Sequence, residues 1–477
     1  MTDARPQSTG ERGDMGRLVW VALLLVGVAL LGLYAILGRQ HYLTTPIKPY
    51  LLLYAAAFGY YIYAAARLLP HLPPSRRLVP LIFGFGVLFR LAVLFAPPSL
   101  STDMYRYVWD GRLTLHGINP YHYAPNANQL RPLRDPDIWL PMEYKAYQTI
   151  YMPVSQFVFA TGNALFGDNL IGYKFLYLLF DVGVMALLWR LLVALGLPAR
   201  NLIWYAWSPL PITEVSLAGH QDVVGVFFLL LAFLLARRPR TEWAAALALV
   251  AAALTKGFAL LLLPLFCRTF GRRFALVAAC GLVYLGLPMW VCLPQFVHGM
   301  QQYLRYVNVN SGLFHWMNQG LSHVTKSHFA IATKISDAAI LGVTVWAAWE
   351  PVEAYPDLLR RAFVVLAVTL LVVPSLFPWY LVWVLPLLPL LDRQPSPAFV
   401  LLTGLVVCLY LYYVSLIAYW WTPVIEYLPF YAVLAWEWHR RRQAQRPAPR
   451  TEIEKTLMMT PAPRHPAPPG LGAGGAS

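Results

Sequence analysis

Long apolar segments follow one another along most of this chain, and short clusters of arginine separate them. The first segment runs from residue 18 to about 37, which is long enough for a helix to cross the hydrocarbon core of a bilayer. Hydrophobic residues make up 58% of the 477 residues and charged residues only 12%, whereas soluble domains carry about 25% charged residues. The pattern therefore excludes a soluble enzyme, a nucleic-acid-binding protein and a disordered chain. It predicts an all-α polytopic membrane protein.

The apolar segments predict about 12–14 transmembrane helices. Two stretches are ambiguous. Residues 151–166 form either a span or an interfacial segment, and residues 243–270 form either one span or a tight hairpin about Lys256 and Gly257. The remaining helices are expected near 18–37, 50–69, 78–96, 170–195, 201–218, 223–236, 274–292, 330–349, 361–373, 379–391, 398–418 and 424–438.

The arginine clusters decide between these alternatives. Cytoplasmic loops of membrane proteins carry an excess of Lys and Arg. If 151–166 does not span and 243–270 forms two short helices, the clusters from Arg67 to Arg442 fall on one side of the membrane. The opposite choice places five arginines on the extracytoplasmic side: Arg190, Arg200, Arg237, Arg238 and Arg240. We therefore expect a multi-pass plasma-membrane protein with both termini in the cytoplasm, and the net charge of +15 mainly reflects this topology.

Composition divides the chain into three parts. Residues 1–17 are expected to be a cytoplasmic segment before an uncleaved first helix, and residues 18–439 the membrane domain. Residues 440–477 are rich in Pro, Ala and Gly and are expected to be a disordered cytoplasmic tail. The four cysteines show no metal-ligand spacing, so neither a zinc site nor a disulfide framework is predicted.

The same topology places the segments richest in polar groups on the outer face. Their convergence predicts one extracytoplasmic site rather than a pore through the membrane. These segments are 97–169, 219–222, Lys256, 293–329, 374–380 and 420–423.

The first outer loop is unusually charged, since residues 97–150 contain five acidic and five basic side chains. Ser101, Thr102 or Asp103 can cap a helix that runs to about residue 116, where glycine and an Asn-Pro pair end it. Asp103, Arg106 and Asp110 then share one face of this helix. The pattern fits a site at the membrane surface. It fits equally a capping aspartate followed by a solvated ion-pair stripe on an interfacial helix.

The segment from Ser101 to Pro125 reads STDMYRYVWDGRLTLHGINPYHYAP. It resembles the first outer loop of bacterial GT-C glycosyltransferases, in particular the polyprenyl-phosphate-mannose-dependent α-mannosyltransferases that are similar to glycosyltransferase family 87. Further motifs agree in the same order, so that the resemblance covers about residues 78–391, although Met152 stands where the family pattern has proline. These motifs are Ile150-Tyr151-Met152-Pro153, Ser208-Pro209-Leu210 followed by Glu214, Gly219-His220-Gln221-Asp222, Thr255-Lys256 and Phe377-Pro378-Trp379-Tyr380.

The resemblance implies a multi-spanning GT-C fold, a lipid-phosphate sugar donor and a catalytic aspartate at position 103. Because a polyprenyl-phosphate sugar carries its own leaving group, transfer requires one base and cations, not the paired acid and base of a glycosidase. Asp103 is the candidate base, and direct attack on the anomeric carbon inverts its configuration. The candidates for holding the phosphate are Arg106, Arg112, Lys256, His220 and His315.

Several of these residues have structural alternatives. Asp110 either orients Arg106 or Arg112, binds an acceptor hydroxyl, or simply pairs with them. Lys256 interrupts an apolar stretch, so it either binds phosphate or extends to the nearest interface.

The remaining candidates lie near helix ends on the outer side. Asp222 either caps the next helix or belongs to the site, and Trp379 and Tyr380 either contact the sugar or form part of an aromatic belt. His220 and Asp222 together lack the third ligand of a recognisable metal site, so no metal or other cofactor is predicted.

The sequence thus predicts a membrane glycosyltransferase. It would move a hexose, mannose according to the resemblance, from a polyprenyl-phosphate donor to a glycan or glycolipid acceptor on the extracytoplasmic face. The alternative is a lipid-linked saccharide flippase or transporter, which would line a cavity at the membrane midplane with polar groups. Membrane lipids are expected partners under both hypotheses, and nucleic acid is not.

Overall fold

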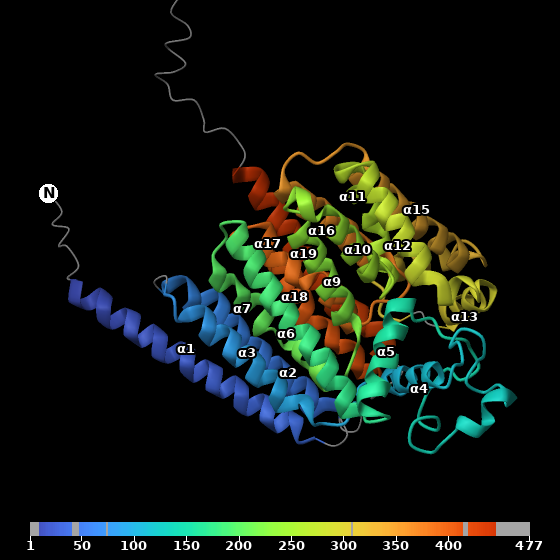
Figure 1. The fold of residues 1–477 in the computed structure, drawn as a ribbon. Helices are drawn as coiled ribbons and strands as arrows, with labels where there is room; N and C mark the ends of the chain where they lie inside the picture. Colours follow the sequence, from blue (N-terminus) through green and yellow to red (C-terminus); the bar gives the residue numbers. More distant parts are fainter. Residues whose placement is uncertain (1–8, 41–46, 73–74, 307–308, 414–417, 445–477) are drawn as a thin grey trace, which may run out of the picture.

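The computed structural model describes residues 9–40, 47–72, 75–306, 309–413 and 418–444. These residues form helices and connecting turns, with no strand among them, so the predicted all-α fold is confirmed. Figure 1 shows α1 along one edge of a helical bundle, and α4 with the loop that follows it at one end. The tail predicted at 440–477 lies outside the described residues beyond Ala444, up to which α19 is helical.

Most of the longer helices lie on the predicted apolar segments, but α1 begins nine residues earlier than predicted, α16 six residues earlier, and α19 extends six residues further at each end. Two further helices, α13 and α14, lie within residues 293–329, for which no helix was predicted. The helices of eight or more residues are α1 (Thr9–Gly38), α2 (Ile47–Ile62), α3 (Leu78–Leu94), α4 (Asp103–Leu115), α5 (Pro153–Phe166), α6 (Leu170–Ala194), α9 (Asp222–Leu235), α10 (Glu242–Ala253), α11 (Leu263–Phe270), α12 (Arg272–Trp290), α13 (Leu293–Tyr306), α14 (Leu313–Ser322), α15 (His328–Ala348), α16 (Tyr355–Val372), α18 (Pro397–Leu405) and α19 (Ala418–Ala444).

Three segments predicted as single helices are broken, and the prediction of continuous helices there was wrong. Residues 201–218 form the short helices α7 (Ile203–Ala206) and α8 (Pro209–Pro211) and a π-helical turn at Ile212–Leu217. Residues 379–391 form 3₁₀ turns at Pro378–Trp383 and Leu385–Leu387 before α17 (Leu388–Leu391), and α18 passes into a 3₁₀ segment at Val406–Tyr413. Prolines account for the first two breaks, because proline lacks the N–H group that continues a helix.

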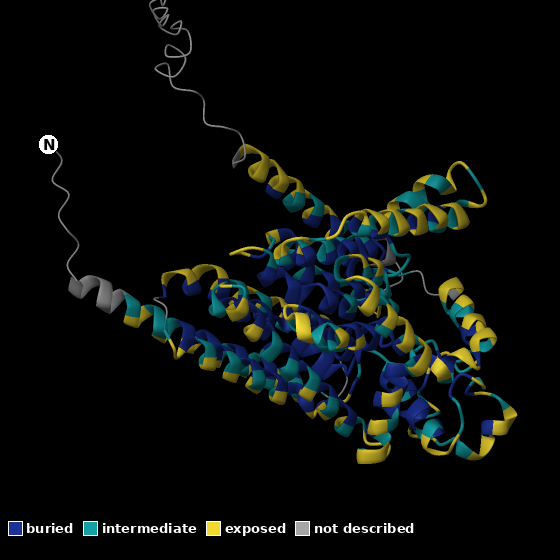
Figure 2. Ribbon diagram, turned by 45° about the horizontal axis from the view of Figure 1, so that its top comes forward, coloured by how far each residue is buried: buried dark blue, intermediate teal, exposed yellow. Residues whose placement is uncertain are grey.

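The helices are suited to a lipid environment. Within the described residues, five helical segments are long and apolar enough to cross a membrane: Gly16–Gly38, Ile47–His71, Leu170–Ala194, Arg272–Trp290 and His328–Ala348. Large apolar side chains are exposed on the outward sides of such helices, for example Leu25, Val283 and Leu341. Figure 2 shows buried residues gathered in the middle of the bundle and exposed ones along its outer helices. Exposed apolar surface of this extent is typical of helices that face lipid.

A buried ion pair joins α3 to α6. Arg90 Nε lies 2.7 Å from Asp181 Oδ2, and both side chains are fully buried. Arg90 Nη2 donates to the other carboxylate oxygen at 3.2 Å, and the Tyr205 hydroxyl donates to Asp181 Oδ1 at 2.7 Å. Arg90 Nη1 donates to the backbone carbonyls of Gly86 and Ala206. The pair therefore fixes α3 and α6 against α7 with most of its hydrogen-bonding groups satisfied.

We predict that Asp181→Asn lowers the stability of the protein strongly, because it leaves the Arg90 guanidinium buried without a counter-charge. Removing one partner of a buried ion pair costs about 3–5 kcal/mol. The measurement is the midpoint of thermal unfolding in detergent. The double variant Arg90→Met, Asp181→Leu is the control, since it removes both charges and should unfold at a higher temperature than the single variant. A single variant as stable as the native protein would contradict this role of the pair.

Candidate functional site

Asp103 begins α4, close to where the sequence predicted this helix to start. The Asp103 backbone N–H donates to the Ser101 hydroxyl at 3.2 Å, so a serine two residues earlier satisfies one free donor of the first turn. Further along α4, Gly111 faces the backbone carbonyl of Phe159 so closely that a Cβ atom at position 111 would overlap it. Glycine therefore allows α4 to lie directly against α5, which sets the position of the first turn.

An interruption of the helical structure before α9 places His220 near Asp103. The break follows the π-helical turn Ile212–Leu217, and Gly219 has a φ of 83°, a conformation that favours glycine. The His220 backbone N–H donates back to the Glu214 carbonyl at 2.9 Å. His220 Nε2 consequently lies 4.0 Å from Asp103 Oδ2.

The first turn of α4 lines a cavity of about 410 Å³. Predicted site residues Asp103, Arg106 and Trp379 belong to its wall, which is otherwise rich in tyrosine. The wall combines the first outer loop with α13 and with the 3₁₀ segments Pro378–Trp383 and Val406–Tyr413. The cavity wall thus brings together parts of three of the polar segments predicted to converge, 97–169, 293–329 and 374–380, whereas 219–222, Lys256 and the described side chains of 420–423 do not line it. The tyrosines that line the cavity are Tyr144, Tyr147, Tyr151, Tyr303, Tyr410, Tyr412 and Tyr413.

The Asp103 carboxylate is partly accessible, with 29% of its side chain exposed. Burial raises the pKa of this carboxyl above its usual value, and the neighbouring His220 and Lys256 offset part of that effect. A carboxylate with a raised pKa is a stronger base than an ordinary aspartate, provided that it remains ionised at the working pH.

Arg106 is held in place by Asp110. Arg106 Nε lies 2.9 Å from Asp110 Oδ1, and its Nη1 donates to the Tyr147 carbonyl at 3.2 Å. The Gln156 amide donates to the other Asp110 oxygen at 2.9 Å. Asp110 is fully buried, so it orients Arg106 and does not reach the cavity wall. Arg106 lines the cavity, and its buried Nη2 has no hydrogen-bond partner among the described residues.

Lys256 lies in the turn between the end of α10 at Ala253 and the 3₁₀ segment Gly257–Leu262. Its Nζ is 2.7 Å from Asp222 Oδ1 and 3.7 Å from the centre of the Tyr380 ring. The Trp383 indole N–H donates to the same Asp222 oxygen at 2.9 Å. The ammonium is therefore directed inward to Asp222, and it lies close enough to Asp103 to lower the pKa of that carboxyl.

Aromatic rings stack beside the carboxylate. The His220 and Trp379 rings are parallel within 15° with their centres 3.7 Å apart, and Phe377 stacks on the other ring of this pair, Trp379, at 4.5 Å. Tyr380 meets Trp379 at an angle of 84°. Trp379 thus contributes both to the cavity wall and to the support of His220.

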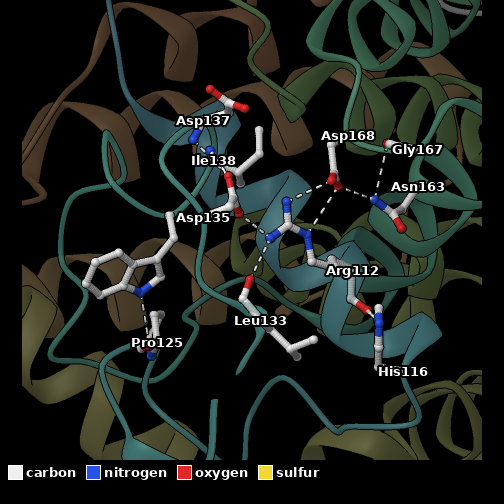
Figure 3. A network of polar contacts seen from close by, with 11 residues as sticks. Arg112, His116, Pro125, Leu133, Asp135, Asp137, Ile138, Asn163, Gly167 and Asp168 are labelled. Atoms are coloured by element: carbon white, nitrogen blue, oxygen red, sulfur yellow. Dashed lines mark hydrogen bonds and ion pairs between the residues drawn. The ribbon is translucent and has the colours of Figure 1, made fainter. Parts of the chain in front are cut away.

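Arg112 lies in a different network, shown in Figure 3. Its guanidinium pairs with Asp135, donates to the Leu133 carbonyl at 2.8 Å, and pairs with Asp168 at 2.7 Å. These contacts connect α4 to the outer loop and to the turn between α5 and α6, and Arg112 is not part of the cavity wall. His315 is on α14 and does not line the cavity either.

Sequence reasoning missed two kinds of site residue. The cavity tyrosines were not distinguished, since tyrosine is abundant in this chain, with 28 residues, and is common at membrane interfaces. Glu214 was noted only as part of a motif, although a carboxylate within an apolar run is by itself a signal for a functional residue. Its carboxylate accepts hydrogen bonds from the Tyr410 hydroxyl at 2.9 and 3.1 Å.

Comparison with protein families gives one decisive match. The family described as alpha-(1->6)-mannopyranosyltransferase, N-terminal domain, matches residues 12–271, which is more than half of the 477-residue chain. The chain belongs to this family. The matched region contains α4, Asp103, His220 and Lys256. Comparisons with curated proteins and with solved structures found no significant match.

Family membership supports mannosyl transfer by a helical membrane glycosyltransferase, as predicted. Among the described residues, no group of three or more His, Cys, Asp or Glu side chains is arranged to hold a metal ion. The polar side chains in the cavity wall include the carboxylates of Asp103 and Glu143, the Arg106 guanidinium and the tyrosine hydroxyls.

We predict that Arg112→Gln lowers stability by about 1–3 kcal/mol, because hydrogen bonds to charged partners are lost, while mannosyl transfer is largely retained. Thermal unfolding and transfer rate are measured on the same preparation. The exposed Arg131 provides a matched control, and Arg131→Gln should leave both quantities unchanged. An unchanged unfolding midpoint combined with weaker donor binding would instead support the phosphate-binding role predicted from the sequence.

Proposed function

We propose that this protein transfers mannose from a polyprenyl-phosphate donor to a glycan or glycolipid acceptor, with Asp103 as the general base. The observation that carries the proposal is the partly exposed Asp103 carboxylate in the cavity wall, one helical turn from Arg106, which lines the same cavity. A hydroxyl that lies against this carboxylate can lose its proton as it attacks the anomeric carbon. General-base assistance of this kind contributes about 10²–10⁴-fold to a rate.

Arg106 and Lys256 are the proposed cations for the donor phosphate. Arg106 belongs to the cavity wall, and its Nη2 has no protein partner among the described residues. Lys256 already pairs with Asp222, so in this proposal its positive charge stabilises the donor phosphate electrostatically while it stays bound to Asp222. His220, Asp222, Trp379 and Tyr380 support these groups. Arg112, Asp110 and His315 are left out of direct contact with the donor.

The bond changes follow from the leaving group. The acceptor oxygen forms a bond to the anomeric carbon while the bond from that carbon to the phosphate oxygen breaks. The electron pair leaves with the phosphate, and the hydroxyl proton goes to Asp103. Attack from the face opposite the phosphate inverts the anomeric carbon, so an α linkage, as in the family description, requires a β-linked donor.

The acceptor is proposed to lie against the tyrosine-rich side of the cavity. Tyrosine hydroxyls donate and accept hydrogen bonds, while the ring faces pack against the apolar face of a pyranose. Glu143 also lines this wall and can accept a hydrogen bond from a sugar hydroxyl. These contacts suit a neutral saccharide better than an anionic one.

A GT-C arrangement with both termini in the cytoplasm is proposed for the whole chain. The first turns of α1 and the last turns of α19 lie away from the end of the bundle that contains α4 (Figure 1). The site at α4 is then extracytoplasmic, at the level where a lipid donor in the outer leaflet meets the acceptor. A flippase would instead concentrate polar groups at the midplane. In the described part of the chain, the buried charges of Arg90 and Asp181, on two helices proposed to span the membrane, pair with each other.

Asp103→Asn tests the assignment of the base. Purified protein in liposomes is offered labelled polyprenyl-phosphate mannose or glucose together with a membrane lipid extract. We expect the native protein to transfer mannose and the variant to be slower by about 10²–10⁴-fold, since the base is lost.

The matched control for this test is Asp137→Asn, which changes an exposed aspartate of the same outer loop and should retain full activity. Undiminished transfer by Asp103→Asn would remove Asp103 from the proposed mechanism. If folded native protein moves neither sugar, a lipid-scrambling measurement on the same liposomes tests the transporter hypothesis.

The raised pKa of Asp103 predicts the pH profile. As pH falls through the pKa, the carboxylate is protonated and cannot act as a base, so activity is lost at low pH. Because burial raises this pKa, the acid limb of kcat/KM should lie above the value of about 3.9 for an ordinary aspartate. Lys256→Met removes a positive charge that lowers the pKa, so the limb should move further up. The exposed Lys326 gives the control Lys326→Met, and a limb that is the same in all three proteins would contradict this electrostatic coupling.

A further inference from the structure

A buried histidine and a buried glutamate continue inward from Asp103. His220 Nε2 is 4.0 Å from Asp103 Oδ2, and His220 Nδ1 is 3.4 Å from Glu214 Oε2. The side chains of His220 and Glu214 are only 1% and 0% exposed. Three titratable groups therefore form a row that starts at the cavity and ends inside the protein.

The hydrogen bonds of His220 determine which ring nitrogen carries the proton. Nδ1 lies 3.0 Å from the backbone carbonyl of Glu214. A carbonyl oxygen only accepts hydrogen bonds, so the proton of the neutral ring belongs on Nδ1. Nε2 then carries a lone pair. It is buried without a hydrogen-bond partner among the described residues, and it faces Asp103. A buried nitrogen in this state is suited to receiving a proton.

Glu214 is fixed so that it can stabilise a charged imidazole. The Tyr410 hydroxyl donates to its two carboxylate oxygens at 3.1 and 2.9 Å. A carboxylate beside Nδ1 favours the imidazolium form and holds the ring in one tautomer. Trp379 stacks on the ring at 3.7 Å and restricts its plane. The arrangement therefore orients Nε2 towards Asp103.

We propose that His220 is a proton-relay residue for Asp103: it takes up the proton that Asp103 removes from the acceptor hydroxyl, and Glu214 stabilises the resulting imidazolium. The inference rests on the proposed transferase function. It gives His220 a role in proton movement, which differs from contact with the donor phosphate.

The proton balance is complete without a further reactant. When the glycosidic bond forms and the bond to phosphate breaks, the hydroxyl proton passes to Asp103 and then to His220 Nε2. Asp103 returns to its ionised form while the transfer is completed, and before the next turnover the imidazolium gives the proton back through the partly exposed Asp103 to water in the cavity. Since 4.0 Å exceeds a direct hydrogen bond, the second transfer requires rotation of the Asp103 side chain or one bridging water molecule.

Charged and titratable groups of the neighbouring elements surround this row. They include Tyr50 on α2, Asp103 and Tyr107 on α4, Tyr151 before α5, Glu214 on the π-helical turn, Asp222 on α9, Lys256 after α10, Tyr303 on α13, Tyr380 on the Pro378–Trp383 segment and Tyr410 on the Val406–Tyr413 segment.

The test separates proton relay from phosphate binding by measuring kcat and the KM for polyprenyl-phosphate mannose. His220→Gln should lower kcat by about 10–100-fold, at or below the low end of general acid–base contributions, with the donor KM unchanged within about twofold. Glu214→Gln, which keeps the shape but removes the charge, should lower kcat by about tenfold. His298→Gln changes an exposed histidine on α13 and serves as the matched control.

Chemical rescue distinguishes proton transfer from support of the fold. Imidazole added to His220→Gly should restore transfer, and substituted imidazoles of similar size should restore it in the order of their basicity. Rescue that follows size alone would overturn the relay, as would a loss confined to the donor KM or a kcat of His220→Gln equal to that of the native protein. If His220→Gln does not fold, Glu214→Gln is measured in its place.

The outcome for the native protein separates this inference from the proposed function. Native protein and His298→Gln that transfer mannose, together with fully active His220→Gln, would reject the relay and leave the transferase intact. Folded native protein that transfers no mannose would reject the proposed function, and the relay with it.

Discussion

The ion pair between Lys256 and Asp222 holds the candidate site together. It joins the start of α9 to the turn after α10, and the indole of Trp383 brings the third element to the same carboxylate oxygen. Bringing two charges out of water costs several kcal/mol per ion unless the geometry is good and further hydrogen bonds satisfy them. At this site the cost is offset because Asp222 accepts from both neighbours and Lys256 lies over the Tyr380 ring. The positions of His220 and Trp379, close in sequence to these residues, follow from the pair.

The other polar groups of the site depend on interruptions of the helices. A continuous helix directs its backbone groups along its own axis and has little capacity to bind a ligand, whereas a broken helix offers chain ends and turns. In this protein the breaks follow Pro209 and Pro211, precede Gly257, and surround Pro378. All three lie next to residues of the site. Breaks at membrane depth are tolerated where protein buries them or where they line a cavity. Pro209, Pro211 and Pro378 are buried, whereas Gly257 is half-buried.

Much of this arrangement could be predicted from the sequence, for identifiable reasons. Capping residues predicted where α4 begins, and the motif of glycine and Asn-Pro predicted where it ends. The positions of the arginine clusters predicted that Lys256 lies on the same side of the membrane as the first outer loop. The partner of each charge could not be predicted. Arg106 and Arg112 are both on α4 and both looked like phosphate ligands, yet Arg106 faces the cavity and Arg112 faces Asp135 and Asp168. Helical spacing gives the direction of a side chain on its own helix, but the neighbour across from it depends on tertiary packing. The pairing of Glu214 with Tyr410, which are 196 residues apart, was beyond reach for the same reason.

The position of Asp103 at the start of α4 depends on Gly111, because the lack of a side chain there allows α4 to lie close against α5. Asp103 precedes Gly111 by eight positions, a rise of about 12 Å along the helix. The helix is stiff over that length, so any shift forced at Gly111 by the Phe159 carbonyl is carried to the carboxylate. The distance between Asp103 and His220 therefore depends on the packing of Gly111, which lies more than two helical turns away. A methyl group at position 111 would push α4 away from α5 and change the distance between Asp103 and His220, although every polar residue of the site would remain in the sequence.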